Sequence, residues 1–138
     1  MKLQLEIESP DVDQMMQAAL RHAGENGWAV AVAICDAGGH LLAFKRMDGV
    51  ATLSTYVAIE KAKSATLGKR ETANFERQLN DGRFSYLSIP VLKAHMEGGI
   101  PVLHEGRVLG AVGVSGVKSA EDAQIARVAI QSLIFPLT

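Results

Sequence analysis

Two histidines and a pair of glycines carry the clearest binding chemistry in this sequence. His22 lies at the flank of an apolar helical stripe, and His95 lies in an irregular stretch beside Glu97 and Gly98-Gly99. A neutral imidazole nitrogen is a common metal ligand, so His22 and His95 are the candidate metal ligands. Each also has an ordinary structural interpretation, and for His22 this is a histidine at the core boundary with one nitrogen in water.

The remaining histidines and the single cysteine have weaker signals. His40 and His104 each border a predicted turn, where a solvated surface residue is the usual outcome, and no metal-type spacing links them. Cys35 lies inside an apolar run and is expected to be an inert core residue.

Two cations are candidates for holding an anionic ligand. Lys61 borders a stripe of alanines, and Arg46 ends a predicted strand. An ammonium group near the core needs an anion. That anion could be a carboxylate of a bound ligand, or an internal partner, for which the sequence offers Glu60, Asp36 or Asp48.

Glycines near strand ends would let backbone N–H groups approach a ligand, although glycine pairs are also common in plain turns. Ser115 lies in the run 113–116 and suits helix capping or anion contact; a dinucleotide loop is excluded because Ala111 replaces its first glycine. The predicted ligand-binding residues are therefore Arg46, Lys61, His95, Glu97, Gly98, Gly99, Pro101 and Ser115.

Hydrophobic periodicity predicts the elements that position these residues. Residues 2–7 alternate apolar and polar and predict an edge strand, and Ser9-Pro10 predicts the N-cap and first turn of an amphipathic helix. Residues 28–35 are apolar at every position, which predicts a strand buried on both faces. Residues 41–46 return from it as a hairpin.

The second half repeats this alternation of helices and a hairpin. Residues 52–68 and 72–80 predict helices, the first with small Ala58, Ala62 and Ala65 on one side. Residues 101–104 and 107–115 predict a second hairpin, and a last helix follows a capping box at Ser119–Asp122. We expect one domain over residues 1–138, an α/β (α+β) three-layer α/β/α sandwich around an antiparallel sheet of about five strands.

Charge and hydropathy exclude several classes of partner. Fourteen basic and fifteen acidic residues leave no electrostatic footprint for nucleic acid or an anionic membrane. The apolar run 28–35 is far shorter than the ~20 residues of a membrane helix. The first residues lack a basic stretch leading into an apolar one, and one cysteine fits a reducing compartment, so the cytoplasm is expected.

Several segments together resemble the GlcG/HbpS-like family, which includes haem-binding proteins and the carboxy-terminal domain of PduO-type corrinoid adenosyltransferases. The segments are Asp36–Gly39 with Phe44–Gly49, Ala58–Ala62, Gly98–Pro101, and Gly110–Gly116 with Asp122 and Ala126. The resemblance implies a profilin-like fold, assembly into a homodimer or larger homo-oligomer, and haem as the cofactor.

The leading hypothesis is a protein that binds a small molecule, haem or a related tetrapyrrole, with haem degradation or redox sensing as its role. His22 and His95 are then the candidate axial ligands. A second hypothesis is an enzyme acting on an organic acid, with Lys61 or His95 as acid or base. A third is an accessory or scaffold module without a ligand.

Overall fold

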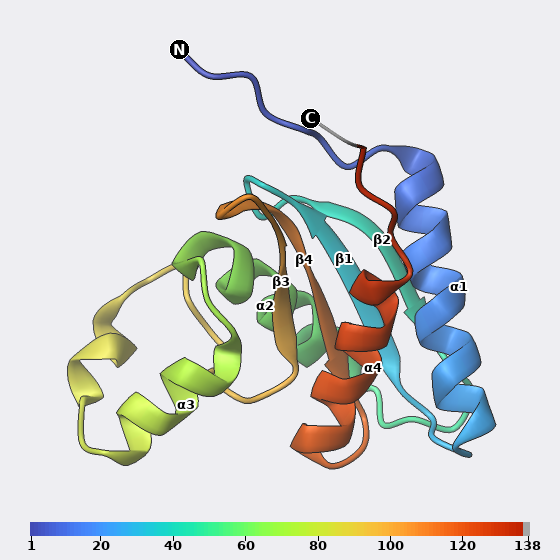
Figure 1. The fold of residues 1–138 in the computed structure, drawn as a ribbon. Coiled ribbons are helices and arrows are strands. Elements are labelled where there is room, and N and C mark those ends of the chain that lie inside the picture. Colours follow the sequence, from blue (N-terminus) through green and yellow to red (C-terminus); the bar gives the residue numbers. More distant parts are fainter. Residues whose placement is uncertain (137–138) are drawn as a thin grey trace.

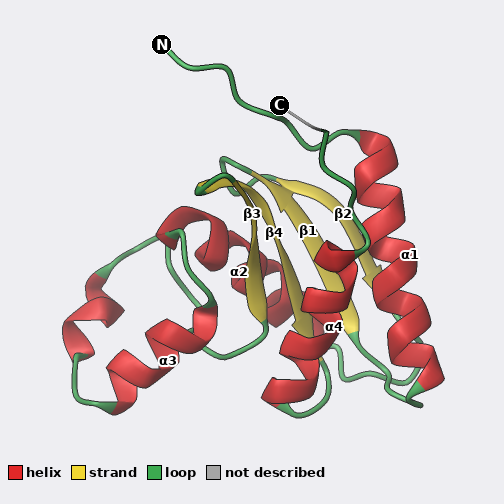
Figure 2. Ribbon diagram, in the orientation of Figure 1, coloured by secondary structure: helices red, strands yellow, loops and turns green. Residues whose placement is uncertain are grey.

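The computed structural model describes residues 1–136, and its elements follow one another as the sequence predicts over most of the chain. The helices are α1 (Ser9–Glu25), α2 (Leu53–Gly68), α3 (Thr72–Asn80) and α4 (Ser119–Gln131), with a short 3₁₀ helix at Phe84–Ser88. The strands are β1 (Ala31–Asp36), β2 (Leu41–Arg46), β3 (Gly99–His104) and β4 (Arg107–Ser115). Figure 2 shows the helices arranged around a single sheet.

Within residues 1–136 the sheet has four antiparallel strands in the order β2-β1-β4-β3. Each predicted hairpin forms, and β1 pairs with β4 at the centre through Ala31 opposite Ser115 and Asp36 opposite Gly110. The sheet therefore has two ends of different character. The turn end carries the tight turns 37–40 and 105–106, and the Ser115 end carries Ala31, Arg46, Gly99 and Ser115.

Helices cover both faces of the sheet, as expected for a three-layer sandwich (Figure 1). Helices α1 and α4 enclose the larger core on one face, where Val30, Val32 and Ile34 are fully buried. Helix α2 covers the other face against small side chains, among them Ala31, Ala33 and Cys35. The apolar residues 28–35 therefore have partners on both sides, as predicted.

Helix α2 lies unusually close to β4 because the facing positions are small. A Cβ added at Gly113 would lie inside van der Waals contact of the Ala58 carbonyl oxygen and 2.5 Å from the Ala62 nitrogen. The alanine stripe predicted from the sequence is thus the contact surface of α2 with its own sheet.

The predicted strand at residues 2–7 is wrong, and the sheet has four strands rather than about five in the described chain. Leu5 and Ile7 do pack against the core. Residues 1–8, the N-terminal arm, are held by side-chain hydrogen bonds and not by a neighbouring strand. Gln4 donates to the Val108 carbonyl at 3.4 Å, and Arg107 donates to the Leu3 carbonyl at 2.7 Å.

Two helix starts also differ from their predicted caps. The N-cap of α1 is Glu8, whose backbone N–H donates to the Asp11 carboxylate at 2.9 Å. The N-cap of α4 is Lys118, whose N–H donates to Glu121 at 3.3 Å. The acidic residue of the capping box of α4 is therefore Glu121, and Asp122 does not cap this helix.

Candidate functional site

Most of the predicted ligand-binding residues lie toward the Ser115 end of the sheet, but they do not surround one space. Arg46, Ala31 and Ser115 form a row across β2, β1 and β4, so Arg46 and Ser115 are two strand spacings, roughly 10 Å, apart. Arg46 is exposed at the end of the edge strand, whereas Ser115 is buried with its hydroxyl 3.3 Å from that of Ser54 on α2.

Lys61 is enclosed beneath this end of the sheet, with 2% of its surface exposed. Its Nζ donates to the Val114 carbonyl at 2.8 Å and to the Asp122 carboxylate at 3.2 Å. The other oxygen of Asp122 accepts the Val117 N–H at 3.1 Å. The anion that Lys61 requires is thus internal, and it is Asp122 rather than Glu60, Asp36 or Asp48.

Burial shifts both groups of this pair toward their neutral forms. Burial lowers the pKa of Lys61, and the charge and hydrogen bond of Asp122 offset part of that shift. Burial likewise raises the pKa of Asp122, with Lys61 acting in the opposite direction. We interpret the pair as an ionic tie between α2 and α4, because each charge has its counter-charge and further hydrogen bonds.

Gly98 and Gly99 close over this tie. Gly98 has a φ of +133°, and a Cβ there would lie 2.7 Å from Lys61 Nζ. Gly99 donates its N–H to the Thr72 hydroxyl at 2.8 Å. A Cβ at Gly99 would overlap the Lys61 backbone, so this glycine lets β3 pack closely against α2, and Pro101 after it is buried.

His95 and Glu97 lie beside α3. The His95 ring packs 5.6 Å from the Phe75 ring, and its Nδ1 is enclosed with no hydrogen-bond partner among residues 1–136. The backbone N–H of Glu97 donates to Glu76 at 2.9 Å.

His22 lies on the other side of the molecule, between α1 and α4. Its Nε2 is 2.8 Å from the side-chain nitrogen of Gln124, and its ring meets Trp28 edge-on. Helix α1 borders β1 and β2 whereas α3 borders β3 at the opposite edge (Figure 1). His22 and His95 are therefore too far apart to ligate one metal together, and which of them binds a ligand stays a prediction.

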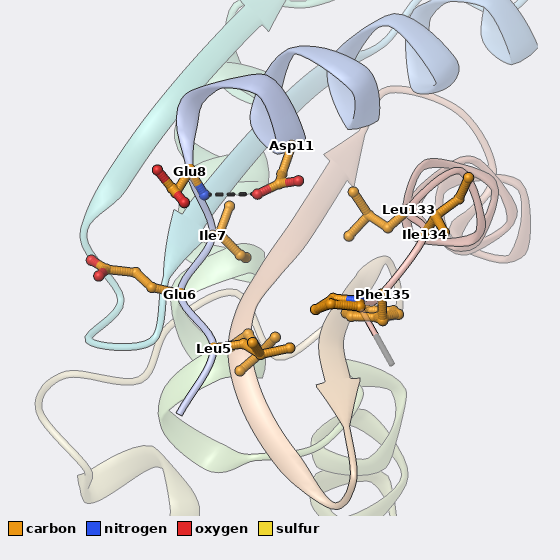
Figure 3. A pocket seen from close by; sticks show the side chains of 10 residues that line it. Leu5, Glu6, Ile7, Glu8, Asp11, Leu133, Ile134 and Phe135 are labelled. Atoms are coloured by element: carbon orange, nitrogen blue, oxygen red, sulfur yellow. Dashed lines mark hydrogen bonds between the residues drawn. The ribbon is translucent and has the colours of Figure 1, made fainter. Parts of the chain in front are cut away.

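The described cavities open at the turn end of the sheet, opposite the Ser115 end. The arm cavity, about 250 Å³, lies between the N-terminal arm and the last described residues (Figure 3). Its wall is mostly apolar, with carboxylates at Glu6, Glu8 and Asp11; the apolar residues are Leu5, Ile7, Leu109, Leu133, Ile134, Phe135 and Pro136. This acidic rim disfavours an anionic ligand.

A second space, the His40 cavity, lies beside the β1–β2 turn. It measures about 380 Å³ and is lined by Asp36, Gly38, His40 and Leu109, together with arm residues 4–6 and Ala37. The Arg107 cavity, about 300 Å³, shares Gln4 and Ala37 with it and adds two cations, Lys69 and Arg107. The turn end thus combines an imidazole, apolar side chains and two cations with the carboxylates of Asp36 and Glu6.

His40 and Asp36 form a fixed pair in this cavity wall. Asp36 Oδ1 lies 3.1 Å from His40 Nδ1 and accepts the backbone N–H groups of Gly38 and His40, both at 2.9 Å. Partial burial opposes charge on Asp36, but these hydrogen bonds outweigh it and lower the pKa of the carboxyl below its usual value. Sequence reasoning treated His40 as a plain surface residue; the signal it missed was an aspartate four residues earlier across a glycine turn.

The groups that haem requires are not free at the Ser115 end of the sheet. Haem needs an axial ligand, cations for two propionates and an apolar slot. At the Ser115 end Lys61 is already paired and glycine-covered. In residues 1–136 there is no cluster of three or more His, Cys, Asp or Glu side chains that could hold a bare metal ion.

Comparison with known proteins points to one family. The family model described as "Haem degrading protein HbpS-like" matches residues 7–131. Protein GlcG of Escherichia coli K12 is 42% identical over 115 residues, covering 83% of this chain and 85% of GlcG.

Two solved structures have the same fold. The crystal structure of HbpS, a protein of Streptomyces reticuli, has a TM-score of 0.88 at 26% identity and covers 98% of this chain and 95% of its own. The crystal structure of a PduOC–haem complex has a TM-score of 0.84 at 26% identity, over 94% of this chain and 96% of that one.

Proposed function

The chain belongs to the HbpS-like family of haem-degrading proteins, and from that premise we propose that it binds haem or a closely related tetrapyrrole. The proposal extends to a homo-oligomeric assembly in the cytoplasm, with haem degradation or redox sensing as its role. When bound, haem would supply a redox-active iron, and the residues around it would control access to that iron.

The observation that carries this proposal is the similarity, over nearly the whole chain, to PduOC, whose crystal structure contains haem. Shared fold alone does not imply shared function. Groups of kinds that haem-binding proteins use lie at the turn end, where His40 and Leu109 line one cavity and Arg107 and Lys69 line the adjoining one.

Hemin titration of the purified protein tests the proposal. We expect a Soret band distinct from that of free hemin, saturating at a fixed molar ratio of hemin to chain. Serum albumin serves as the control for nonspecific uptake. A spectrum that matches free hemin, or uptake that never saturates, contradicts specific binding and favours a scaffold without a ligand.

A further inference from the structure

The two edge strands of the sheet differ in how well they are protected against a further strand. In residues 1–136 these edges are β2 and β3, on opposite sides of the sheet (Figure 2). An edge strand presents backbone N–H and C=O groups that have no strand partner, and proteins usually block such an edge with proline, charge, a bulge or a covering element. An edge without this protection can accept a strand from another chain.

The β3 edge is blocked over its first half. The Val114 N–H donates to the Gly98 carbonyl at 3.0 Å, so the alternation of an antiparallel pair turns the backbone groups of Gly99 and Pro101 away from β4. The Thr72 hydroxyl accepts the Gly99 N–H at 2.8 Å and donates to the Gly99 carbonyl at 3.5 Å. Pro101 has no N–H. Neither position offers a free donor to a further strand.

The β2 edge lacks these devices. The Met47 N–H donates to the Val30 carbonyl at 2.9 Å, and the same alternation turns the backbone groups of Phe44 and Arg46 away from β1. The pairing of β2 with β1 is regular over residues 43–46, and within residues 1–136 no strand lies on the outer side. The backbone of β2 is therefore open to a partner strand.

The side chains of β2 indicate what that partner strand is. Leu41 and Leu42, at the start of the strand, are 49% and 42% exposed, and Lys45 and Arg46 are exposed at its end. A second copy of β2 running antiparallel would place its leucines beside these cations, whose long apolar stems can cover them. A parallel copy would gather all four cations at one end, and like charges side by side repel. The strand thus complements an antiparallel copy of itself.

Helix α2 adds apolar surface beside the same edge. A Cβ at Gly39, in the β1–β2 turn, would lie 3.4 Å from the Leu67 side chain, which is 41% exposed. Ile59 and Phe44 both pack against the small-residue core on this face of the sheet. Tyr56 precedes Ile59 by one helical turn, so it lies on the same side of α2, and it is 72% exposed. A strand added to β2 would find an apolar helix flank next to it.

We propose that β2 pairs antiparallel with β2 of a second copy of this chain, about a two-fold axis at Phe44, so that the two sheets become continuous. Phe44 is an outward-facing position near the middle of the strand, whereas an axis at Lys45 or Arg46 would set like charges opposite each other. With the axis at Phe44, Arg46 lies opposite Leu42 of the partner subunit. The inference rests on the proposed homo-oligomeric assembly and names the surface that forms it.

Arg46→Pro tests the backbone pairing, with Arg46→Ala as its matched control. Proline removes the outward N–H of an exposed edge residue without removing a hydrogen bond between β2 and β1. We expect Arg46→Pro to weaken self-association by at least about tenfold, measured by light scattering over a dilution series. Arg46→Ala keeps the N–H and should retain the wild-type mass, and circular dichroism should show the same fold for both variants.

Leu42→Lys and Leu42→Glu test the register. Both variants replace the same exposed leucine with one charged side chain, so loss of apolar surface affects them alike. In the proposed pairing, Leu42→Lys meets Arg46 of the partner subunit with like charge and Leu42→Glu meets it with opposite charge. We expect Leu42→Lys to associate at least about threefold more weakly than Leu42→Glu at low salt. Equal affinities would contradict this register.

Amide hydrogen exchange of the wild-type protein tests the pairing without a substitution. The amides of Phe44 and Arg46 should exchange more slowly at concentrations where the oligomer forms, and unchanged exchange would contradict the proposed pairing. An oligomer that persists equally in Arg46→Pro and Arg46→Ala would show that assembly uses another surface, so that the inference is wrong and the proposed assembly stands. A wild-type monomer would overturn both.

Discussion

Lys61 and Asp122 form a buried ion pair between α2, β4 and α4, with 2% and 3% of their surfaces exposed. Removing two charges from water is costly, and their attraction offsets that cost only when both partners are present. The pair as a whole therefore adds little to the stability of the fold, but removing one of the two side chains alone is strongly destabilising.

Lys61→Met is expected to lower the free energy of unfolding by about 3–5 kcal/mol, because it leaves the Asp122 carboxylate buried without a cation. The double variant Lys61→Met/Asp122→Leu removes both charges and should recover a large part of that loss. Urea unfolding at neutral pH measures both. A double variant no more stable than the single one would contradict the coupling, since the two effects would then be independent.

The charge of Asp36 makes the stability of the protein depend on pH. Its pKa in the folded protein lies below the ~3.9 of an unfolded aspartate, so its contribution to stability is complete above that value and is lost as pH falls through the folded-state pKa. We expect the stability difference between the wild-type protein and Asp36→Asn to shrink as pH falls below about 4. Unfolding curves across this range measure it; a difference that grows on acidification would show the opposite shift.

Residue partners were the hardest feature to predict from the sequence. The burial of Lys61 followed from its place beside the alanine stripe of α2, but its partner is 61 residues away and had been assigned to a helix cap. The Asp36–His40 pair is local, yet only the turn geometry shows that the two side chains meet.

At the scale of elements, the close approach of α2 to β4 depends on glycine at position 113. Gly113→Ala is expected to destabilise the protein by about 1–3 kcal/mol, because its Cβ would overlap the α2 backbone at Ala58 and Ala62, which cannot move independently. Thermal and urea unfolding measure the effect.

Gly24→Ala is the matched control for Gly113→Ala. Apart from its chain neighbours and the nearby backbone of α1, no described atom lies within 4 Å of a Cβ at this exposed position, and its φ lies outside the left-handed region. It should stabilise the protein by roughly 0.5–1 kcal/mol through helix propensity. Equal losses in the two variants would argue against a specific α2–β4 contact.

Helices and strands could be predicted where the spacing of apolar residues shows which face of the element is buried, as for α1, α3 and the two hairpins. Residues 2–7 show where this reasoning fails. Alternation reports that Leu5 and Ile7 face the core, which is correct, but it does not specify a neighbouring strand to receive the backbone hydrogen bonds.

At the scale of the whole molecule, apolar surface remains uncovered in the single chain. Leu53 and Tyr56, three residues apart on α2, are 68% and 72% exposed, and β2 and β3 are the edges of the sheet in residues 1–136. The alanine stripe of α2 is buried within the chain itself and does not contribute to this uncovered surface. None of the helices in residues 1–136 is both long and apolar enough to cross a bilayer.

We expect light scattering to show an oligomer at micromolar concentration, and Leu53→Glu/Tyr56→Glu to shift it toward the monomer by placing charge in the interface. Phe84→Glu, which charges an exposed aromatic residue on the 3₁₀ helix, is the control and should leave the mass unchanged. A wild-type monomer would contradict the predicted assembly.

Haem content measures the central claim most directly. The protein should be produced in cells supplied with 5-aminolaevulinate, purified by size exclusion, and assayed for haem as the pyridine haemochrome. The account predicts haem that co-elutes with the protein at a fixed molar ratio. Protein that elutes without haem, and that also retains none after incubation with hemin and a second size-exclusion step, would contradict it.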